Sequence, residues 1–123
     1  MKTSSKKGKG RRLQNFVRDR LVTSFPSLED DDIRTAIMGE NGEDIKLSPA
    51  ARKLIPYSFE CKNQERLNIW GSLKQAEDNC PEDREPVLIF KRNRSKTYAV
   101  IEIDEFIELI GDKNDKRTKN KEK

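Results

Sequence analysis

The chain has no histidine and only two cysteines, Cys61 and Cys80, among its 123 residues. The cysteines show no C-x-x-C spacing, so zinc fingers and other structural zinc sites of the Cys/His type are excluded. Without histidine, Ser-His-Asp triads and nucleases with a histidine at the metal are excluded as well. Thiols without disulfide spacing are typical of a reducing compartment, and we expect a cytoplasmic, intracellular protein.

Apolar residues are also scarce, at 33% of the chain against 39% charged residues. This length allows one domain. The composition predicts a disordered basic arm over residues 1–9, a folded domain over 10–110 and a charged flexible tail over 111–123. No apolar run approaches the length of a membrane span and the N-terminus carries no apolar signal segment, so we expect no membrane association.

The net charge is only +4, but it is unevenly distributed. Residues 1–20 hold eight Lys and Arg against Asp19 alone, whereas residues 28–44 hold seven acids against Arg34. A basic segment beside an acidic pocket suits an enzyme that binds phosphates and concentrates a divalent metal ion. A solubilising tail is the alternative interpretation of the basic segment.

Three residues form the strongest candidate for chemistry: Asp44, Glu60 and Lys62. Glu60 and Lys62 lie two apart in a predicted strand over 57–62, so their side chains point to the same side and Cys61 points to the other. Strand pairing that brings Asp44 beside Glu60 would give two carboxylates suited to Mg²⁺ or Mn²⁺. Lys62 could then orient or activate a metal-bound water. The alternative is an exposed Glu-Lys pair on an edge strand, which would contribute little to stability.

An Asp followed by Glu-x-Lys on the next strand resembles the PD-(D/E)xK nuclease superfamily, most closely the archaeal and phage-type Holliday junction resolvases. The resemblance covers about residues 10–110 and implies an α/β, restriction-endonuclease-like αβββαβ core with a mixed central sheet flanked by helices. It implies that Asp44, Glu60 and the Cys61 carbonyl hold Mg²⁺ (or Mn²⁺), and that Lys62 positions the attacking water. A metal-dependent endonuclease of branched DNA that acts as a homodimer follows by implication.

Two glutamines extend the resemblance. Resolvases of this type carry a glutamate four residues after an N-terminal glycine, and here Gly10 plus four is Gln14, which could bind a metal-ligated water but brings no charge. A hydrogen-bonded helix glutamine without a role is the alternative. Gln75 lies in the predicted second helix, where several families of the superfamily use a glutamine to position the water or the lysine.

Basic and polar side chains in three segments are predicted to contact DNA phosphates. They are Lys7, Lys9, Arg11 and Arg12 near the N-terminus, Ser48 and Arg52 on a short helix, and Arg92, Arg94 and Lys96 at a hairpin tip. The alternatives are a helix that only covers the sheet edge and a hairpin tip that is merely solvated.

The remaining pattern alternates helices and strands. The predicted elements are a helix over 10–25, a strand over 33–38, a turn over 39–42, a strand opening at 44, a helix over 48–54, strands over 57–62, 86–90 and 97–103, and helices over 67–79 and 104–110. We expect Phe106, Ile107 and Ile110 to face inward, Trp70 to pack on the sheet, and Glu43 to be exposed.

Other functions fit part of this pattern. A nuclease of the same fold could act on flap, nicked or single-stranded DNA. A nuclease-fold protein that binds DNA without cutting it is favoured by Gln14 and disfavoured by the intact Asp44, Glu60 and Lys62. A basic RNA-binding protein is a weaker alternative, because no known RNA-binding motif is present.

Overall fold

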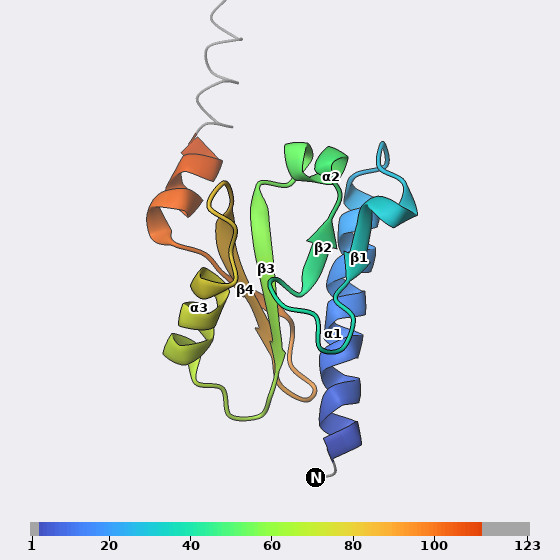
Figure 1. The fold of residues 1–123 in the computed structure, drawn as a ribbon. Coiled ribbons are helices and arrows are strands. Elements are labelled where there is room, and N and C mark those ends of the chain that lie inside the picture. Colours follow the sequence, from blue (N-terminus) through green and yellow to red (C-terminus); the bar gives the residue numbers. More distant parts are fainter. Residues whose placement is uncertain (1–2, 112–123) are drawn as a thin grey trace, which may run out of the picture.

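The computed structural model describes residues 3–111, with side chains from residue 6 onward. Its elements are α1 (Thr3–Ser24), the 3₁₀ turn η1 (Asp30–Asp32), β1 (Ile33–Thr35), β2 (Ile45–Leu47), α2 (Pro49–Leu54), β3 (Tyr57–Asn63), α3 (Ile69–Asp78), β4 (Glu85–Lys91), β5 (Tyr98–Val100) and a last helix over 103–111. The long helix α1 and the shorter α3 lie on opposite sides of the strands (Figure 1).

The strands form one mixed sheet and one hairpin. In the three-stranded sheet β3 pairs in parallel with β4, and β4 pairs antiparallel with β5. The hairpin pairs β1 with β2, and the Asp44 N–H just before β2 donates to the Phe59 carbonyl at 2.9 Å, which joins the hairpin to the free edge of β3. The structure therefore confirms a mixed α/β domain with a mixed sheet flanked by helices.

The core lies between α1 and one face of β3 and β4. Leu13 and Val17 of α1 are buried against Phe59 and Cys61 of β3, in the face that the 3–4 spacing predicts. Because side chains alternate along a strand, Glu60 points to the other face, toward α3. Side chains on one face of β3 thus belong to the hydrophobic core, and those on the other face belong to the candidate site.

Helix α1 begins earlier than the sequence predicts. It starts at Thr3, so residues 3–9 belong to the helix in this structure, whereas the sequence predicts a disordered arm there; residues 1–2 lie outside the described part. The Lys9 carbonyl accepts a hydrogen bond from Asn63 Nδ2 at 3.3 Å, which ties the early turns of the helix to β3. Most of the predicted tail, residues 112–123, also lies outside the described residues.

The short helix α2 is confirmed with its capping residues. The Ser48 hydroxyl accepts from the Ala51 N–H at 3.1 Å, and Pro49 occupies the first helical position. By contrast β1 ends at Thr35, three residues earlier than predicted, because Glu40 bonds to the Ile37 N–H and turns the chain there.

Two predicted burials are wrong. Trp70 is 82% exposed, because α3 packs through the small side chains of Ser72 and Ala76, and Trp70 lies on the other side of that helix. Phe106, Ile107 and Ile110 lie in the predicted last helix but are exposed. Within residues 3–111, no helix has the length and apolar character needed to cross a bilayer.

Candidate active site

Asp44 lies directly against β3. Its Oδ2 accepts a hydrogen bond from the Cys61 N–H at 2.7 Å, and its own N–H donates to the Phe59 carbonyl at 2.9 Å. The carboxylate thus takes the place of a backbone acceptor beside β3. Residues 17 apart in sequence are brought together where the hairpin meets the sheet.

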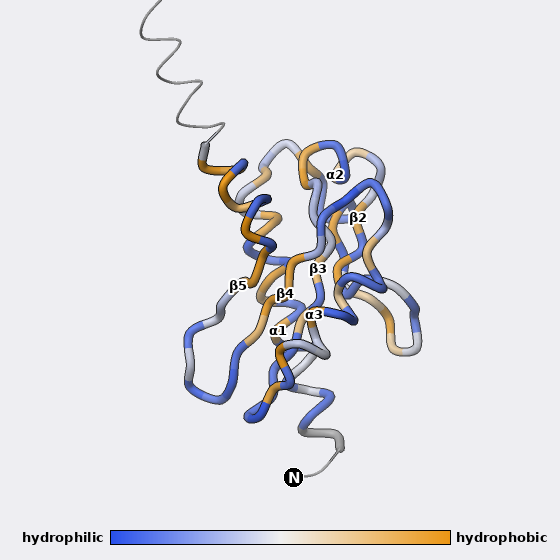
Figure 2. Tube along the Cα trace, turned by 90° about the vertical axis from the view of Figure 1, so that its left-hand side faces the viewer, coloured by the Kyte–Doolittle hydropathy of each residue, from blue (hydrophilic) through white to orange (hydrophobic). Residues whose placement is uncertain are grey.

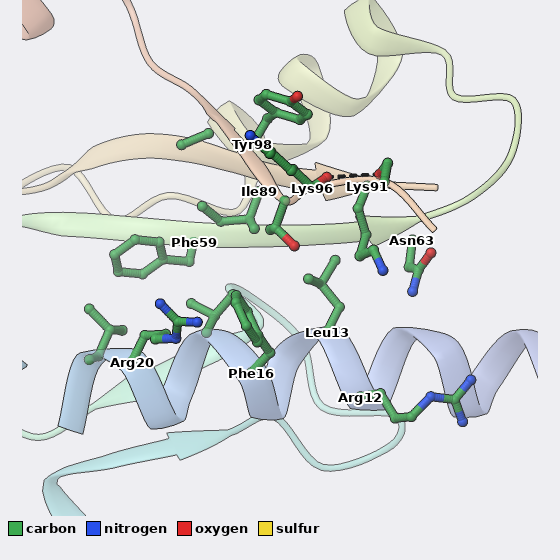
Figure 3. A pocket seen from close by; sticks show the side chains of 15 residues that line it. Arg12, Leu13, Phe16, Arg20, Phe59, Asn63, Ile89, Lys91, Lys96 and Tyr98 are labelled. Atoms are coloured by element: carbon green, nitrogen blue, oxygen red, sulfur yellow. Dashed lines mark hydrogen bonds between the residues drawn. The ribbon is translucent and has the colours of Figure 1, made fainter. Parts of the chain in front are cut away.

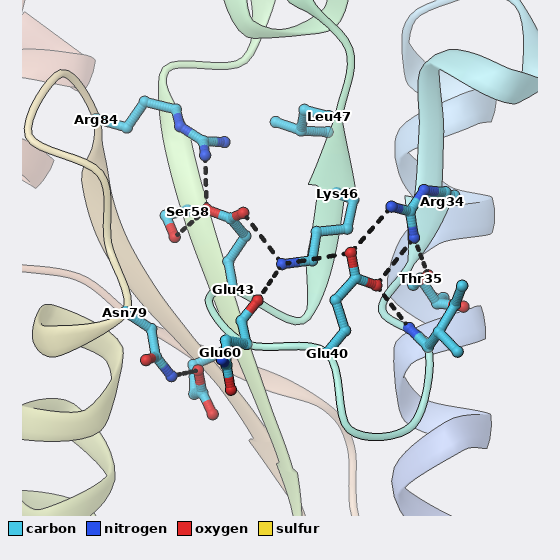
Figure 4. Close-up of polar contacts among 12 residues, drawn as sticks. Arg34, Thr35, Glu40, Glu43, Lys46, Leu47, Ser58, Glu60, Asn79 and Arg84 are labelled. Atoms are coloured by element: carbon cyan, nitrogen blue, oxygen red, sulfur yellow. Dashed lines mark hydrogen bonds and ion pairs between the residues drawn. The ribbon is translucent and has the colours of Figure 1, made fainter.

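Glu60 and Lys62 point to the same side of β3, as the alternation predicts. Glu60 is only 3% exposed, and its Oε2 lies 3.9 Å from the Lys62 ammonium. The other oxygen, Oε1, accepts from Asn79 Nδ2 at 3.2 Å at the end of α3 (Figure 4). Glu60 is therefore held from two sides.

Burial sets the ionisation of both acids. It raises the pKa of Asp44, while the Cys61 N–H and then the charge of Lys62 act in the opposite direction. Burial also raises the pKa of Glu60, and the negative charge of Asp44 raises it further. Two carboxylates that disfavour each other's charge in a partly buried place leave a negative potential that a cation would relieve.

The donor atoms available here are all oxygens. The Cys61 carbonyl points to the same edge of β3 as the Cys61 N–H, which is the edge occupied by Asp44. Mg²⁺ is commonly held by one or two carboxylates and keeps several waters, so Asp44, Glu60 and this carbonyl fit it. Within residues 3–111 no three His, Cys, Asp or Glu side chains gather around one point, so the set does not suit a metal that needs four protein ligands.

The Cys61 thiol itself is not part of this donor set. It is buried in the core with Leu13 and Val17, and burial raises its pKa well above the usual range. A neutral thiol on the core side of the strand is a packing group.

Gln14 lies beside Asp44, as its position after Gly10 suggested. Both residues line a hollow of about 280 Å³, together with Lys7 and Arg11 of α1. The described structure therefore brings an amide, rather than a third carboxylate, to this side of the candidate metal site.

A second hollow, of about 510 Å³, lies beside Lys62. It is lined by Cys61, Lys62 and Asn63 of β3, by Lys6 and Lys9 of α1, and by Arg66 of the loop that follows β3. The early turns of α1 therefore bring cations to the lysine end of the site. The sequence did not predict Arg66 as a contact, because it is a single arginine beside Glu65 in a polar loop.

The second predicted glutamine is placed differently. Gln75 is exposed on α3, and none of the described hydrogen bonds joins it to Glu60 or Lys62. The amide that reaches Glu60 belongs to Asn79, four residues later. Asn79 could have been identified from the sequence, because it lies four residues after Gln75 and side chains at positions i and i+4 of a helix lie near each other.

The predicted phosphate contacts fall at two ends of the molecule. The β4–β5 turn with Arg92, Arg94 and Lys96 lies at the same end as the N-terminus of α1, whereas α2 lies at the opposite end (Figure 1). Ser48 donates to Asp32 Oδ1 at 2.6 Å, so its hydroxyl serves the fold. Arg52 is exposed on α2, away from the predicted contacts on α1 and on the β4–β5 turn.

An ion network holds the turn that carries Asp44. Glu43 is not exposed as predicted, because its carboxylate lies 2.6 Å from Arg84 Nη2 and 3.6 Å from Lys46 Nζ (Figure 4). Lys46 also approaches Glu40, which pairs with Arg34 at 3.0 Å. The bond from the Arg34 guanidinium lowers the pKa of Glu40 to about 2.

Comparison with family models, with curated proteins and with solved structures gives no match to this chain. Membership of the nuclease superfamily therefore stays a prediction. It depends on the residues of the site.

Proposed function

We propose that this protein is a metal-dependent DNA endonuclease that hydrolyses phosphodiester bonds. The observation that carries the proposal is the position of Asp44, whose carboxylate is bound to the backbone of β3 beside Glu60 and Lys62. A carboxylate from one strand end and a Glu-x-Lys on the next strand are the groups that this chemistry uses. The alternative of an exposed Glu-Lys pair is not favoured, since Glu60 is buried.

Each side chain has a defined task in this proposal. Asp44, Glu60 and the Cys61 carbonyl would hold Mg²⁺, which would activate water and offset charge on the phosphate when it is bound. Asn79 holds the Glu60 carboxylate in place through its hydrogen bond. Lys62 positions the attacking water and stabilises the developing negative charge, while Lys6 and Lys9 bind the phosphate backbone beside it.

The order of elements supports a restriction-endonuclease-like fold for this domain. A helix, a hairpin, a strand, a second helix and a parallel strand follow one another, with α1 and α3 on opposite sides of the sheet. This order fits the αβββαβ core of restriction-endonuclease-like nucleases, with α2 inserted between the second and third strands. The position of Asp44 before the second strand and of Glu60 and Lys62 on the third fits the same core.

Branched DNA is the substrate class that we propose, with a Holliday junction as the first candidate. The domain is small, and two segments rich in Lys and Arg, residues 6–12 and 91–96, lie at the same end of it. A nuclease acting on flap, nicked or single-stranded DNA is the second candidate. Gln14, in place of an acid beside Asp44, favours a third, a DNA-binding protein of the same fold without catalysis.

Cleavage assays on a panel of substrates test this proposal. A four-way junction, a fork, a flap, a nicked duplex and a linear duplex are incubated with the protein in Mg²⁺ or in EDTA. We expect cutting only with Mg²⁺ and fastest on the four-way junction. Equal rates on every form would remove the junction assignment, and binding without cutting in Mg²⁺ and in Mn²⁺ would favour the inactive protein.

Replacing Lys62 by methionine is expected to slow cleavage about 10²-fold, because a positioned cation is lost while the site keeps its shape. The DNA dissociation constant should change little. Single-turnover rates and binding in Ca²⁺ measure the two quantities separately. Lys74→Met, at an exposed lysine of α3, is the control and should cleave normally.

Replacing Arg92 and Arg94 together by glutamine is expected to weaken DNA binding at low salt. If both contact phosphates, the slope of log K against log salt concentration becomes shallower by about 2. Titrations from low to moderate salt give this slope. Lys53→Gln at the opposite end is the control, and Arg52→Gln shows whether α2 contacts DNA; an unchanged slope in the double variant would remove the turn from the DNA surface.

A further inference from the structure

The last helix presents an apolar stripe to solvent. Ile103, Phe106, Ile107 and Ile110 follow the i, i+3, i+4, i+7 spacing of a packed helix face, yet they are 41–63% exposed. The same segment is hydrophobic over most of its length in Figure 2. A stripe of this kind normally lies against another element, and within residues 3–111 its four side chains are left about half exposed.

Another surface of the molecule has an open groove that could accept a helix. It has a volume of about 820 Å³ and lies between α1 and the β4–β5 side of the sheet (Figure 3). Its floor is apolar, formed by Leu13, Val17, Phe59 and Ile89. Helix α1 covers this face of the sheet beside β3, and the part over β5 is left open to a second helix.

The charges of the groove and the helix are opposite. Arg12 and Arg20 of α1 and Lys91 and Lys96 of the strand side line the groove, and none of its lining residues is acidic. The helix over 103–111 has three acids, Asp104, Glu105 and Glu108, and no Lys or Arg. The two surfaces therefore match both in apolar area and in the sign of their charge.

We propose that the helix over 103–111 of one copy occupies the groove of a second copy, and that the second helix occupies the first groove in return. The apolar stripe would cover the groove floor, and its acids would face the basic rim. A reciprocal exchange has two-fold symmetry and closes on itself, so it yields a dimer and not a chain of copies.

Other occupants fit less well. Residues 112–123 contain six Lys and Arg against three acids and no apolar residue, so this segment matches neither the floor nor the rim. A nucleic acid strand would suit the four cations, but it would find a largely aliphatic floor and would leave the apolar stripe of the last helix uncovered. The proposal does not rest on nuclease activity, because its readout is the oligomeric state.

Sedimentation velocity of the full chain over a concentration series tests the dimer. We expect a species of twice the 14.3 kDa chain mass. Phe106→Glu with Ile107→Glu removes the stripe and should weaken dimerisation about 30-fold or more, as expected for a buried aromatic anchor. Ile37→Glu, at an apolar residue that is 70% exposed outside both surfaces, is the control and should leave the dimer intact.

Mixing two monomeric variants identifies the surfaces. The groove variant Lys96→Glu with Ala99→Glu should be monomeric alone, and so should the helix variant. Their equimolar mixture should regain a dimer, because one intact helix meets one intact groove. Circular dichroism and thermal melting of each variant show that a loss of dimer is not a loss of fold.

Several outcomes would overturn the proposal. They are a monomeric wild type at every concentration, a dimer that persists in either variant, and two monomeric variants whose mixture stays monomeric. A dimer formed helix to helix would give the second result, because it would persist in the groove variant. A monomeric wild type whose binding to a single-stranded oligonucleotide is lost in the groove variant would assign the groove to nucleic acid instead.

Discussion

Replacing Glu60 by glutamine is expected to reduce Mg²⁺-dependent DNA cleavage by about 10³-fold, because a bound metal ion contributes several kcal/mol at the transition state and each 1.36 kcal/mol is a factor of ten. The amide keeps the size of the carboxylate, and its oxygen can still accept the bond from Asn79. Only the charge that would hold the metal is removed. DNA affinity, measured in Ca²⁺ or without metal, should be nearly unchanged.

The same substitution is expected to raise the melting temperature at pH 7 without Mg²⁺. Burial and the charge of Asp44 raise the pKa of Glu60, so the folded protein binds this proton more tightly than the unfolded chain. Ionised Glu60 therefore destabilises the fold above its unfolded pKa, and this cost disappears as the pH falls through the raised, folded-state pKa. The advantage of the glutamine variant should shrink on acidification.

Glu77→Gln, at an exposed residue of α3, is the matched control for charge. It should change neither the cleavage rate nor the pH dependence of melting. A Glu60→Gln protein that cuts at the wild-type rate would remove Glu60 from the metal site. A variant less stable than the wild type at pH 7 would mean that the ionised carboxylate supports the fold.

Local signals in the sequence predicted several elements of the fold and the sides to which the residues of β3 point. The serine cap and Pro49 located α2, and the alternation over β3 separated Cys61 from Glu60 and Lys62. Asp44 could be connected to Glu60 only through the family resemblance, because strand pairing decides which residues meet. The hydrogen bond from the Cys61 N–H supplies that connection in the structure.

Periodicity failed where it had to identify the partner of an apolar face. The last helix has the predicted stripe, but the described chain leaves Phe106 and Ile107 about half exposed. In α3 the packed face is made of Ser72 and Ala76, since small side chains let the helix approach the sheet, and Trp70 is left in solvent. A pattern predicts that a face is apolar, and it leaves open what the face contacts.

The ion pair of Glu43 with Arg84 has no local signal at all. The residues are 41 apart in sequence, and each lies in a segment with several other charges. In the fold the Arg84 side chain is 2% exposed, and it also donates to the Tyr57 carbonyl at 3.3 Å. This arginine therefore links the loop before β4 to the start of β3 and to the turn that carries Asp44.

Replacing Arg84 by methionine is expected to lower the free energy of unfolding by about 3–5 kcal/mol, because Glu43 is left partly buried with a weaker partner. Urea denaturation measures the loss. The surface pair provides the matched control: Arg34→Met, at a half-exposed arginine bound to Glu40, should cost no more than about 1 kcal/mol.

The double variant Glu43→Gln, Arg84→Met separates two free energies: the cost of leaving Glu43 charged without Arg84, and the net contribution of the ion pair to stability. Because a buried pair contributes little beyond its own desolvation, the double variant should recover much of the stability that Arg84→Met loses. It would still lack the tie between the Asp44 turn and the loop before β4, so its cleavage rate should stay below that of the wild type. A double variant no more stable than Arg84→Met would show that Arg84 stabilises the fold mainly through the Tyr57 carbonyl and its packing.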